Sequence, residues 1–154
     1  MSVHIKMNKG FTLIELVVSI AILLVLFAII TLNVSPLPSN SLQSANLDTL
    51  LSDLRSQQTW SMSNGSPYGI HFETESYSLF KGDTYTQGLP TNTVINLDSG
   101  IIFSNVTLPN YVIIFSPGSG DVAAYTAGQD SFNLTSSVTG KSTSVKINKY
   151  GATY

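Results

Sequence analysis

The sequence predicts an α+β protein in which a long N-terminal helix packs on an antiparallel β-sheet or β-sandwich head. Three patterns support this fold class. Residues 11–32 form a nearly unbroken apolar run, leucines recur at helical spacing between residues 47 and 54, and short alternating runs follow from residue 68. These patterns divide the chain into an apolar stem and a polar, β-rich remainder.

The composition excludes several classes of protein before any motif is considered. The 154 residues contain no cysteine, which excludes a disulfide scaffold, a zinc ribbon, an iron–sulfur site and a thiol nucleophile. Charged residues make up only 10 % of the chain, and the net charge of −2 provides no basic footprint for nucleic acid. The two histidines, His4 and His71, lie far apart in the sequence, so we expect no histidine-based metal centre.

The apolar run at residues 11–32 is long enough to cross a membrane. As a helix it spans roughly 33 Å, and the hydrocarbon core of a bilayer is about 30 Å thick. Lys6 and Lys9 precede the run without a balancing acid, so the positive-inside rule places the N-terminus in the cytoplasm and the remainder outside. We therefore expect a single-pass protein of the inner (cytoplasmic) membrane.

Three simpler interpretations of this run compete with a functional one: a secretory signal peptide, a plain membrane anchor and a buried core helix. A signal peptide has a shorter apolar core and a small-x-small cleavage site, and a core helix has no need of the basic flank. Glu15 argues against all three interpretations, because a carboxylate inside an apolar span is costly and marks a functional position.

Residues 9–16 read Lys-Gly-Phe-Thr-Leu-Ile-Glu-Leu and lead into the long apolar stretch. This string resembles the class III signal of type IV pilins and pseudopilins. The resemblance implies that a membrane prepilin peptidase removes the leader, residues 1–10, by cutting after Gly10, and then N-methylates Phe11. It also implies that residues 11–32 are kept as a transmembrane and assembly helix, with the Glu15 carboxylate pairing with the amino terminus of a neighbouring subunit.

Electrostatics is consistent with that role for Glu15. In the dry core of a filament, an amine and a carboxylate from adjacent subunits each relieve the burial of the other. Removing one partner of such a buried pair costs about 3–5 kcal/mol. We therefore expect Glu15 to set the register of assembly rather than to act as a catalyst.

Residues 33–64 are expected to form a kinked, amphipathic continuation of the helix. Pro36 and Pro38 lack a backbone donor and disfavour helix in the residue before them. Helical spacing then resumes over about residues 41–62, and Asn64-Gly65 supplies a stop. This segment is expected to cover one sheet with a leucine face, which consists of Leu47, Leu50, Leu51 and Leu54.

Residues 65–154 are expected to form an extracytoplasmic, β-rich head domain. Alternating runs at residues 68–73 and 77–81 predict a hairpin that turns at residues 74–76. Turn-forming residues separate six further candidate strands, at residues 93–97, 101–107, 111–116, 122–126, 131–138 and 142–148.

Parts of this head resemble the H-type minor pseudopilins, the GspH/FimT group. The resemblance lies in residues 69–72 (Gly-Ile-His-Phe), residues 112–120 (Val-Ile-Ile-Phe-Ser-Pro-Gly-Ser-Gly) and a terminal strand with a glycine turn at residues 144–151. It implies a long N-terminal helix packed against two β-sheets. The absence of cysteine differs from many major pilins and favours a minor subunit or a cysteine-poor lineage.

No arrangement of residues in the sequence predicts a catalytic site, a metal site or a cofactor. Glu73 and Glu75 are better explained as exposed turn acids than as an acid–base pair, and His71 is better explained as a strand histidine than as a ligand. Asp121 and Asp130 lie in glycine-bearing loops and could share a calcium ion, but their spacing is not that of an EF-hand.

Three lysines near the end of the sequence, Lys141, Lys146 and Lys149, suggest an alternative function. Some FimT-like minor pilins bind DNA through a basic C-terminal region, and three lysines would give weak, salt-sensitive and non-specific binding. The same residues are also explained as a solvated edge strand, because lysine on an edge prevents edge-to-edge pairing.

These observations predict a structural subunit and not an enzyme: a minor pilin or pseudopilin of a type IV pilus or a type II secretion-like filament. The implied partners are other pilin subunits, the prepilin peptidase and methyltransferase, an inner-membrane assembly platform, and the membrane before assembly. The alternative is a DNA- or surface-binding minor pilin of a competence or adhesion pilus.

Overall fold

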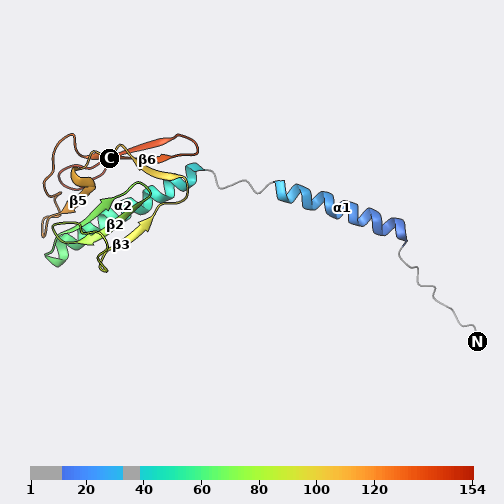
Figure 1. Cartoon of the computed structure of the whole chain (residues 1–154), viewed down its shortest axis with the longest axis horizontal. Helices are drawn as coiled ribbons and strands as arrows, with labels where there is room; N and C mark the ends of the chain where they lie inside the picture. Colours follow the sequence, from blue (N-terminus) through green and yellow to red (C-terminus); the bar gives the residue numbers. More distant parts are fainter. Residues whose placement is uncertain (1–11, 33–38) are drawn as a thin grey trace, which may run out of the picture. The chain divides into compact units, whose positions relative to one another are not determined.

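A computed structural model describes residues 12–32 and 39–154 of the chain. The chain divides into two compact units, residues 1–36 and residues 37–154. Within the described residues, the first unit contains helix α1 (Leu13–Leu32), and the second contains helix α2 (Ser39–Asn64) followed by seven β-strands (Figure 1). Residues 37–154 are called the head below. The kink expected at Pro36 and Pro38 falls outside the described residues.

The strands of the head form two antiparallel sheets, which confirms the α+β class. The first sheet has the strand order β3-β2-β1-β5, and its members are β1 (Tyr68–Phe72), β2 (Ser76–Lys81), β3 (Thr93–Asn96) and β5 (Val112–Phe115). The second has the order β4-β6-β7, and its members are β4 (Ile101–Ser104), β6 (Ser131–Ser136) and β7 (Ser142–Lys146). A tight turn labelled η1 (Pro109–Tyr111) leads into β5, and its central residue Asn110 has a left-handed φ of 53°.

Helix α2 packs against strands of both sheets, with contacts to β1 and β5 in the first sheet and to β6 in the second. Its side chains Leu50 and Leu54 are 0 % and 2 % exposed and lie in a core that both sheets share. The leucine pattern predicts contact with one sheet, and the structure corrects this. Because each sheet is small and turns an apolar face inward, the same helix contributes to the burial of both.

Aromatic rings within this core join the two sheets. The ring of Phe103 in β4 meets that of Phe72 in β1 edge to face, with centroids 5.1 Å apart. Phe72 also contacts Phe132 of β6 at 4.9 Å. Such edge-to-face and tilted contacts are favourable beyond the apolar area that they bury. The sheets therefore contact each other directly as well as through α2.

The buried face of α2 is only partly apolar. Gln43, Gln57 and Ser61 are between 0 % and 3 % exposed. Gln57 lies three residues after Leu54, whereas Gln43 and Ser61 each lie seven residues, or two helical turns, from a buried leucine. The Gln43 side-chain amide donates a hydrogen bond to the Leu134 carbonyl oxygen in β6 over 2.7 Å. The Ser61 hydroxyl donates to the Phe115 carbonyl oxygen in β5, also over 2.7 Å. The N-terminal part of α2 is therefore bonded to the second sheet, and its C-terminal part to the first.

A third polar contact holds the middle of α2. The Tyr77 hydroxyl in β2 donates to the Asp53 carboxylate over 2.6 Å. Burial, together with the hydrogen bond to Asp53 and its charge, raises the pKa of Tyr77 above its ordinary value of 10.0. The tyrosine therefore stays protonated, and remains the donor, throughout the neutral pH range.

The outer face of the first sheet is covered by the loop between β2 and β3. Tyr85 in this loop lies against Phe80, with ring centroids 5.5 Å apart, and its hydroxyl donates to the buried Ser78 hydroxyl over 3.4 Å. Its ring also stacks on His71 at a centroid distance of 3.9 Å. One loop tyrosine thus shields neighbouring positions of β1 and β2.

The prediction of a strand at residues 122–126 is wrong. Val122 makes one isolated antiparallel bridge with Phe115, and Ala124 adopts a left-handed φ of 52° that ends extended pairing. The Val122 amide instead donates to the Lys149 carbonyl oxygen over 2.8 Å. This segment therefore links β5 to the C-terminal turn. The remaining candidate strands correspond to β1–β7, most of them shorter than expected.

We predict that Leu54→Ala destabilises the head by about 2–5 kcal/mol, because it leaves a cavity where α2 meets both sheets. Urea unfolding, followed by the fluorescence of Trp60 as the single tryptophan, measures the change. Val94→Ala is the control, because Val94 is 59 % exposed and its truncation is expected to stay within about 0.5 kcal/mol. Equal effects of the two substitutions would contradict the packing described above.

Candidate functional site

The start of α1 carries the carboxylate of Glu15, and the local sequence explains how the helix begins there. Thr12 precedes the first helical residue, and its Oγ1 accepts a hydrogen bond from the Glu15 amide over 3.3 Å. An N-cap residue satisfies an otherwise unpaired amide in this way. The Thr12 hydroxyl also lies 3.5 Å from Glu15 Oε2, to which it donates. Thr12 and Glu15 have the spacing of a capping box.

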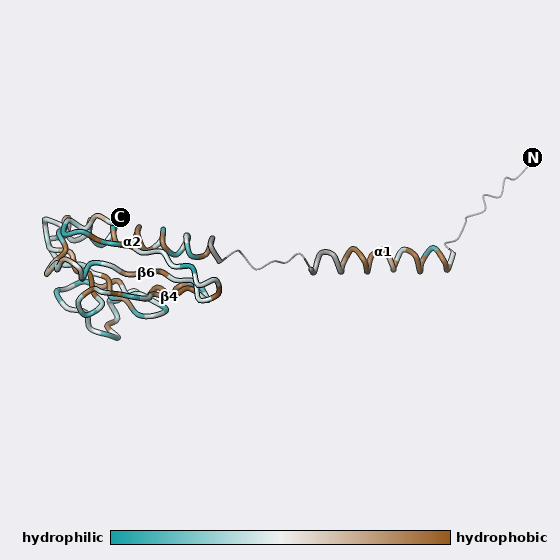
Figure 2. The backbone as a smooth tube through the Cα atoms, turned by 90° about the horizontal axis from the view of Figure 1, so that it is seen from above, coloured by the Kyte–Doolittle hydropathy of each residue, from teal (hydrophilic) through white to brown (hydrophobic). Residues whose placement is uncertain are grey.

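Beyond this cap, the described side chains of α1 are almost entirely apolar (Figure 2). The Ser19 hydroxyl is satisfied within the helix, where it donates to the Glu15 carbonyl oxygen over 2.7 Å. Large apolar side chains point outward all round the helix, with exposures from 81 % at Leu13 down to 49 % at Ile20. A continuous apolar surface of this extent is typical of a segment that lies in lipid or against other chains.

One face of α1 is slightly hollowed. Its shallow groove is entirely apolar, and the small side chain of Ala21 lies among larger neighbours, namely Val18, Ile22, Val25 and Leu26. Small residues allow two helix backbones to approach closely in an apolar environment. The groove is therefore suited to contact with another apolar helix.

Two predictions about the N-terminal segment extend beyond the described residues. Gly10 and Phe11, the expected cleavage and methylation positions, lie outside them, as does the rest of the leader at residues 1–10. Among the residues that are described, no helix meets the length and hydropathy that a membrane crossing requires. The roles of Gly10, Phe11 and Glu15 stay predictions.

The three C-terminal lysines are exposed, and they do not all lie at one place. Lys141 precedes β7, whereas Lys146 ends it, so the two are roughly 17 Å apart along the edge of the second sheet. Lys149 follows in the next turn, with its Nζ 5.4 Å from the ring centroid of Tyr150. DNA binding through these residues stays a prediction.

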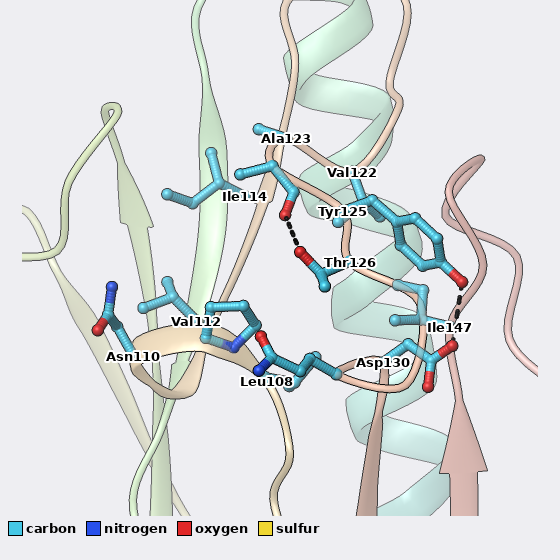
Figure 3. A pocket seen from close by; sticks show the side chains of 13 residues that line it. Leu108, Asn110, Val112, Ile114, Val122, Ala123, Tyr125, Thr126, Asp130 and Ile147 are labelled. Atoms are coloured by element: carbon cyan, nitrogen blue, oxygen red, sulfur yellow. Dashed lines mark hydrogen bonds between the residues drawn. The ribbon is translucent and has the colours of Figure 1, made fainter.

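Asp130 lines a mainly apolar cavity of about 130 Å³ between the 108–114 segment and the 122–130 loop. Asp130 is 9 % exposed, and its carboxylate accepts the Tyr125 hydroxyl over 3.0 Å (Figure 3). That hydrogen bond raises the pKa of Tyr125, as do burial and the charge of Asp130. Within the described residues, no group of three or more histidines and acids is placed to hold a metal ion.

His71 occupies the outer face of β1, and its ring is stacked on that of Tyr85. Its Nδ1 is 3.9 Å from Glu73 Oε1, too long for a hydrogen bond, and has no hydrogen-bond partner in the described part of the chain. Burial lowers the pKa of His71 below 6.5, and the charge of Glu73 only partly offsets this. His71 is therefore neutral at physiological pH.

Comparison with known proteins bears on the N-terminal segment. Residues 5–31 match the family model described as the prokaryotic N-terminal methylation motif. The chain therefore carries a type IV pilin-like class III signal, and this motif implies a membrane-anchored, pilin-like precursor. Searches of the curated proteins and of the solved structures found no match. The resemblance of the head to the H-type minor pseudopilins stays a prediction.

We predict that the head loses stability as the pH falls below about 6.5, because the unfolded chain protonates His71 more readily than the folded chain does. The contribution of this histidine to the free energy of unfolding is complete at a pH above its pKa in the unfolded chain. It is lost as the pH falls from that value toward the lower pKa of the folded chain. Thermal unfolding across this pH range should show the decline in the wild type and a weaker one in His71→Phe, which keeps an aromatic ring against Tyr85. His4→Gln, which removes the other histidine, should behave like the wild type. An unchanged decline in His71→Phe would refute the assignment.

Proposed function

We propose that this protein is a structural subunit, a minor pilin or pseudopilin, of a type IV pilus or a type II secretion-like filament. The observation that carries the proposal is the match of residues 5–31 to the N-terminal methylation motif. The outward-facing apolar side chains of α1 support it, because a helix of this kind requires lipid or neighbouring helices around it. In this role the chain acts through assembly and not through catalysis.

Processing is proposed to occur at the bond between Gly10 and Phe11. This bond lies just before Thr12, the residue that caps α1. Cutting there removes Lys6 and Lys9, keeps the complete apolar helix and creates a positively charged amine at Phe11. The partners of this step are the prepilin peptidase and its methyltransferase activity.

Assembly is proposed to move the helix at residues 11–32 from the inner membrane into a bundle of like helices. Lipid tails are as apolar as leucine, so apolar burial alone gives little drive, and packing and polar contacts must supply specificity. The groove at Ala21 provides close packing. The Glu15 carboxylate, paired with the Phe11 amine of a neighbouring subunit, provides the register.

This function predicts the mass of the mature chain. In a strain with an active prepilin peptidase, intact-mass spectrometry should find a protein that starts at Phe11 and carries one added methyl group. A bulky residue at position 10, as in Gly10→Leu, should leave the precursor unprocessed, because the peptidase site then meets a side chain. A wild-type protein that keeps Met1 in such a strain would overturn the proposal.

The charge of Glu15 can be separated from its place in the capping box. Glu15→Gln retains a side chain suited to the capping box but has no charge. If the carboxylate pairs with an amine, both Glu15→Gln and Glu15→Ala should be processed but should enter filaments at least about tenfold less than the wild type, because removing one partner of a buried pair costs about 3–5 kcal/mol.

Quantitative immunoblotting of sheared filaments and of the membrane fraction measures this incorporation. Ser19→Ala is the matched control, since its hydroxyl bonds within its own helix and its loss leaves the carboxylate in place. Near-normal incorporation of Glu15→Gln, with loss only in Glu15→Ala, would assign Glu15 to helix capping and reject the intersubunit pair.

A further inference from the structure

A recess on the head lies where the β1–β2 turn approaches the end of β4. It is a cleft of about 570 Å³, and its rim carries Glu73, Thr74, Asn105 and Tyr111. A backbone hydrogen bond of 2.8 Å from the Phe103 amide to the Thr74 carbonyl oxygen fixes the two sheets next to each other here. A volume of this size lies in the range of small-molecule sites. The cleft is remote in sequence from the N-terminal motif.

Three residues beside this cleft adopt left-handed backbone conformations, two of them in a turn that the Val112 amide closes by donating to the Pro109 carbonyl oxygen. Asn105 and Asn110 have φ values of 47° and 53°, which asparagine tolerates. Tyr111 has a φ of 58°, a left-handed conformation that a bulky side chain rarely adopts. Tyr111 is also 57 % exposed, so it gains little from packing. Strain of this kind gathers where a side chain must be held for binding.

The polar side chains at the rim of the cleft are either held in place by a neighbour or free to bond a ligand. The Glu73 carboxylate is held in place by the Ser76 hydroxyl, which donates to its Oε2 over 3.1 Å. In the described part of the chain, the side chains of Thr74, Asn105 and Tyr111 have no hydrogen-bond partner, so each can bond a ligand. Together they offer hydroxyl and amide donors and a charged acceptor.

Charge and packing narrow the class of ligand. No lysine or arginine is among the described residues that line the cleft, and Glu73 would repel an anion. The floor residues Phe72 and Phe103 are at most 5 % exposed, so a lipid chain would find little apolar surface there. The other apolar residues that line the cleft are Val106, which is partly buried, and Tyr111, which is exposed. A neutral ligand with several hydroxyls and one apolar face fits these groups.

We propose that this cleft binds one unit of a neutral saccharide. The apolar face of the sugar ring lies on Tyr111, and its hydroxyls bond the Glu73 carboxylate and the Asn105 amide. A hydroxyl that donates to a carboxylate makes a charge-assisted hydrogen bond, which is stronger than a neutral one. This site is independent of the filament role, since it uses no residue of α1.

The test is a titration followed by NMR on the isotope-labelled full chain, in a detergent without a sugar headgroup. The probes are glucose, galactose, N-acetylglucosamine and N-acetylgalactosamine, and glycerol serves as a polyol that lacks a ring face. At least one of the sugars should shift the amide signals around residues 73–74 and 104–111 in a saturable way. The proposal is overturned if no sugar does so, or if glycerol binds as tightly as the sugars.

Variants separate binding from folding. Tyr111→Asn tolerates the left-handed backbone and should keep the wild-type melting temperature, while its affinity for the sugar falls about tenfold or more. Glu73→Gln keeps a hydrogen-bond acceptor for Ser76 and should weaken binding several-fold. Tyr154→Asn is the control, because Tyr154 is 72 % exposed and does not line the cleft. Wild-type affinity in Tyr111→Asn would overturn the proposal.

Discussion

The head depends on the position of one helix between two small sheets. Leu50 and Leu54 of α2 lie in a core built by a four-stranded and a three-stranded sheet, and neither sheet has a second described helix to cover it. Side-chain hydrogen bonds at Gln43 and Ser61 then bond one end of the helix to each sheet. Apolar burial thus supplies the stability of this arrangement, and the polar contacts fix the position of the helix along its own axis.

Much of the head could be predicted from local patterns in the sequence. The alternation of residues 68–81 predicts the hairpin of β1 and β2, and the leucine spacing predicts α2, because both patterns reflect the period of a single element. The expected strand at residues 122–126 failed because local alternation says nothing of the Lys149 carbonyl oxygen, which pairs with Val122. The conformation of that segment depends on a hydrogen-bond partner that is distant in sequence.

The buried polar face of α2 could not be predicted for the same reason. A glutamine or serine on a helix is normally solvated, and only the tertiary structure brings the Gln43 amide to a carbonyl oxygen that lies 91 residues away. The cleft at Tyr111 depends on backbone angles at residues 105–111, for which the sequence carries no signal beyond two asparagines. The N-terminal motif differs, because its residues are contiguous and can be recognised without a fold. The roles predicted for Gly10, Phe11 and Glu15 therefore rest on sequence alone.

The two units also differ in the surfaces that they expose. The first unit exposes apolar side chains and the carboxylate of Glu15, so we expect it to interact with its surroundings mainly through apolar packing. The head exposes hydroxyls, amides and scattered charges on a self-contained core. In the proposed function, this division lets the first unit serve assembly while the head meets water and solutes.

Four of the hydrogen bonds that hold α2 have a consequence for how the head can vary, in contrast to the Tyr77–Asp53 bond, which needs two particular side chains. Gln43, Gln58 and Ser61 donate to the carbonyl oxygens of Leu134, Gly120, Tyr150 and Phe115, which are main-chain atoms. Every residue type offers the same carbonyl group, so these bonds do not depend on which side chains the strands and loops carry. Mutations can therefore change the outer surface of the head extensively while the helix remains attached in the same place.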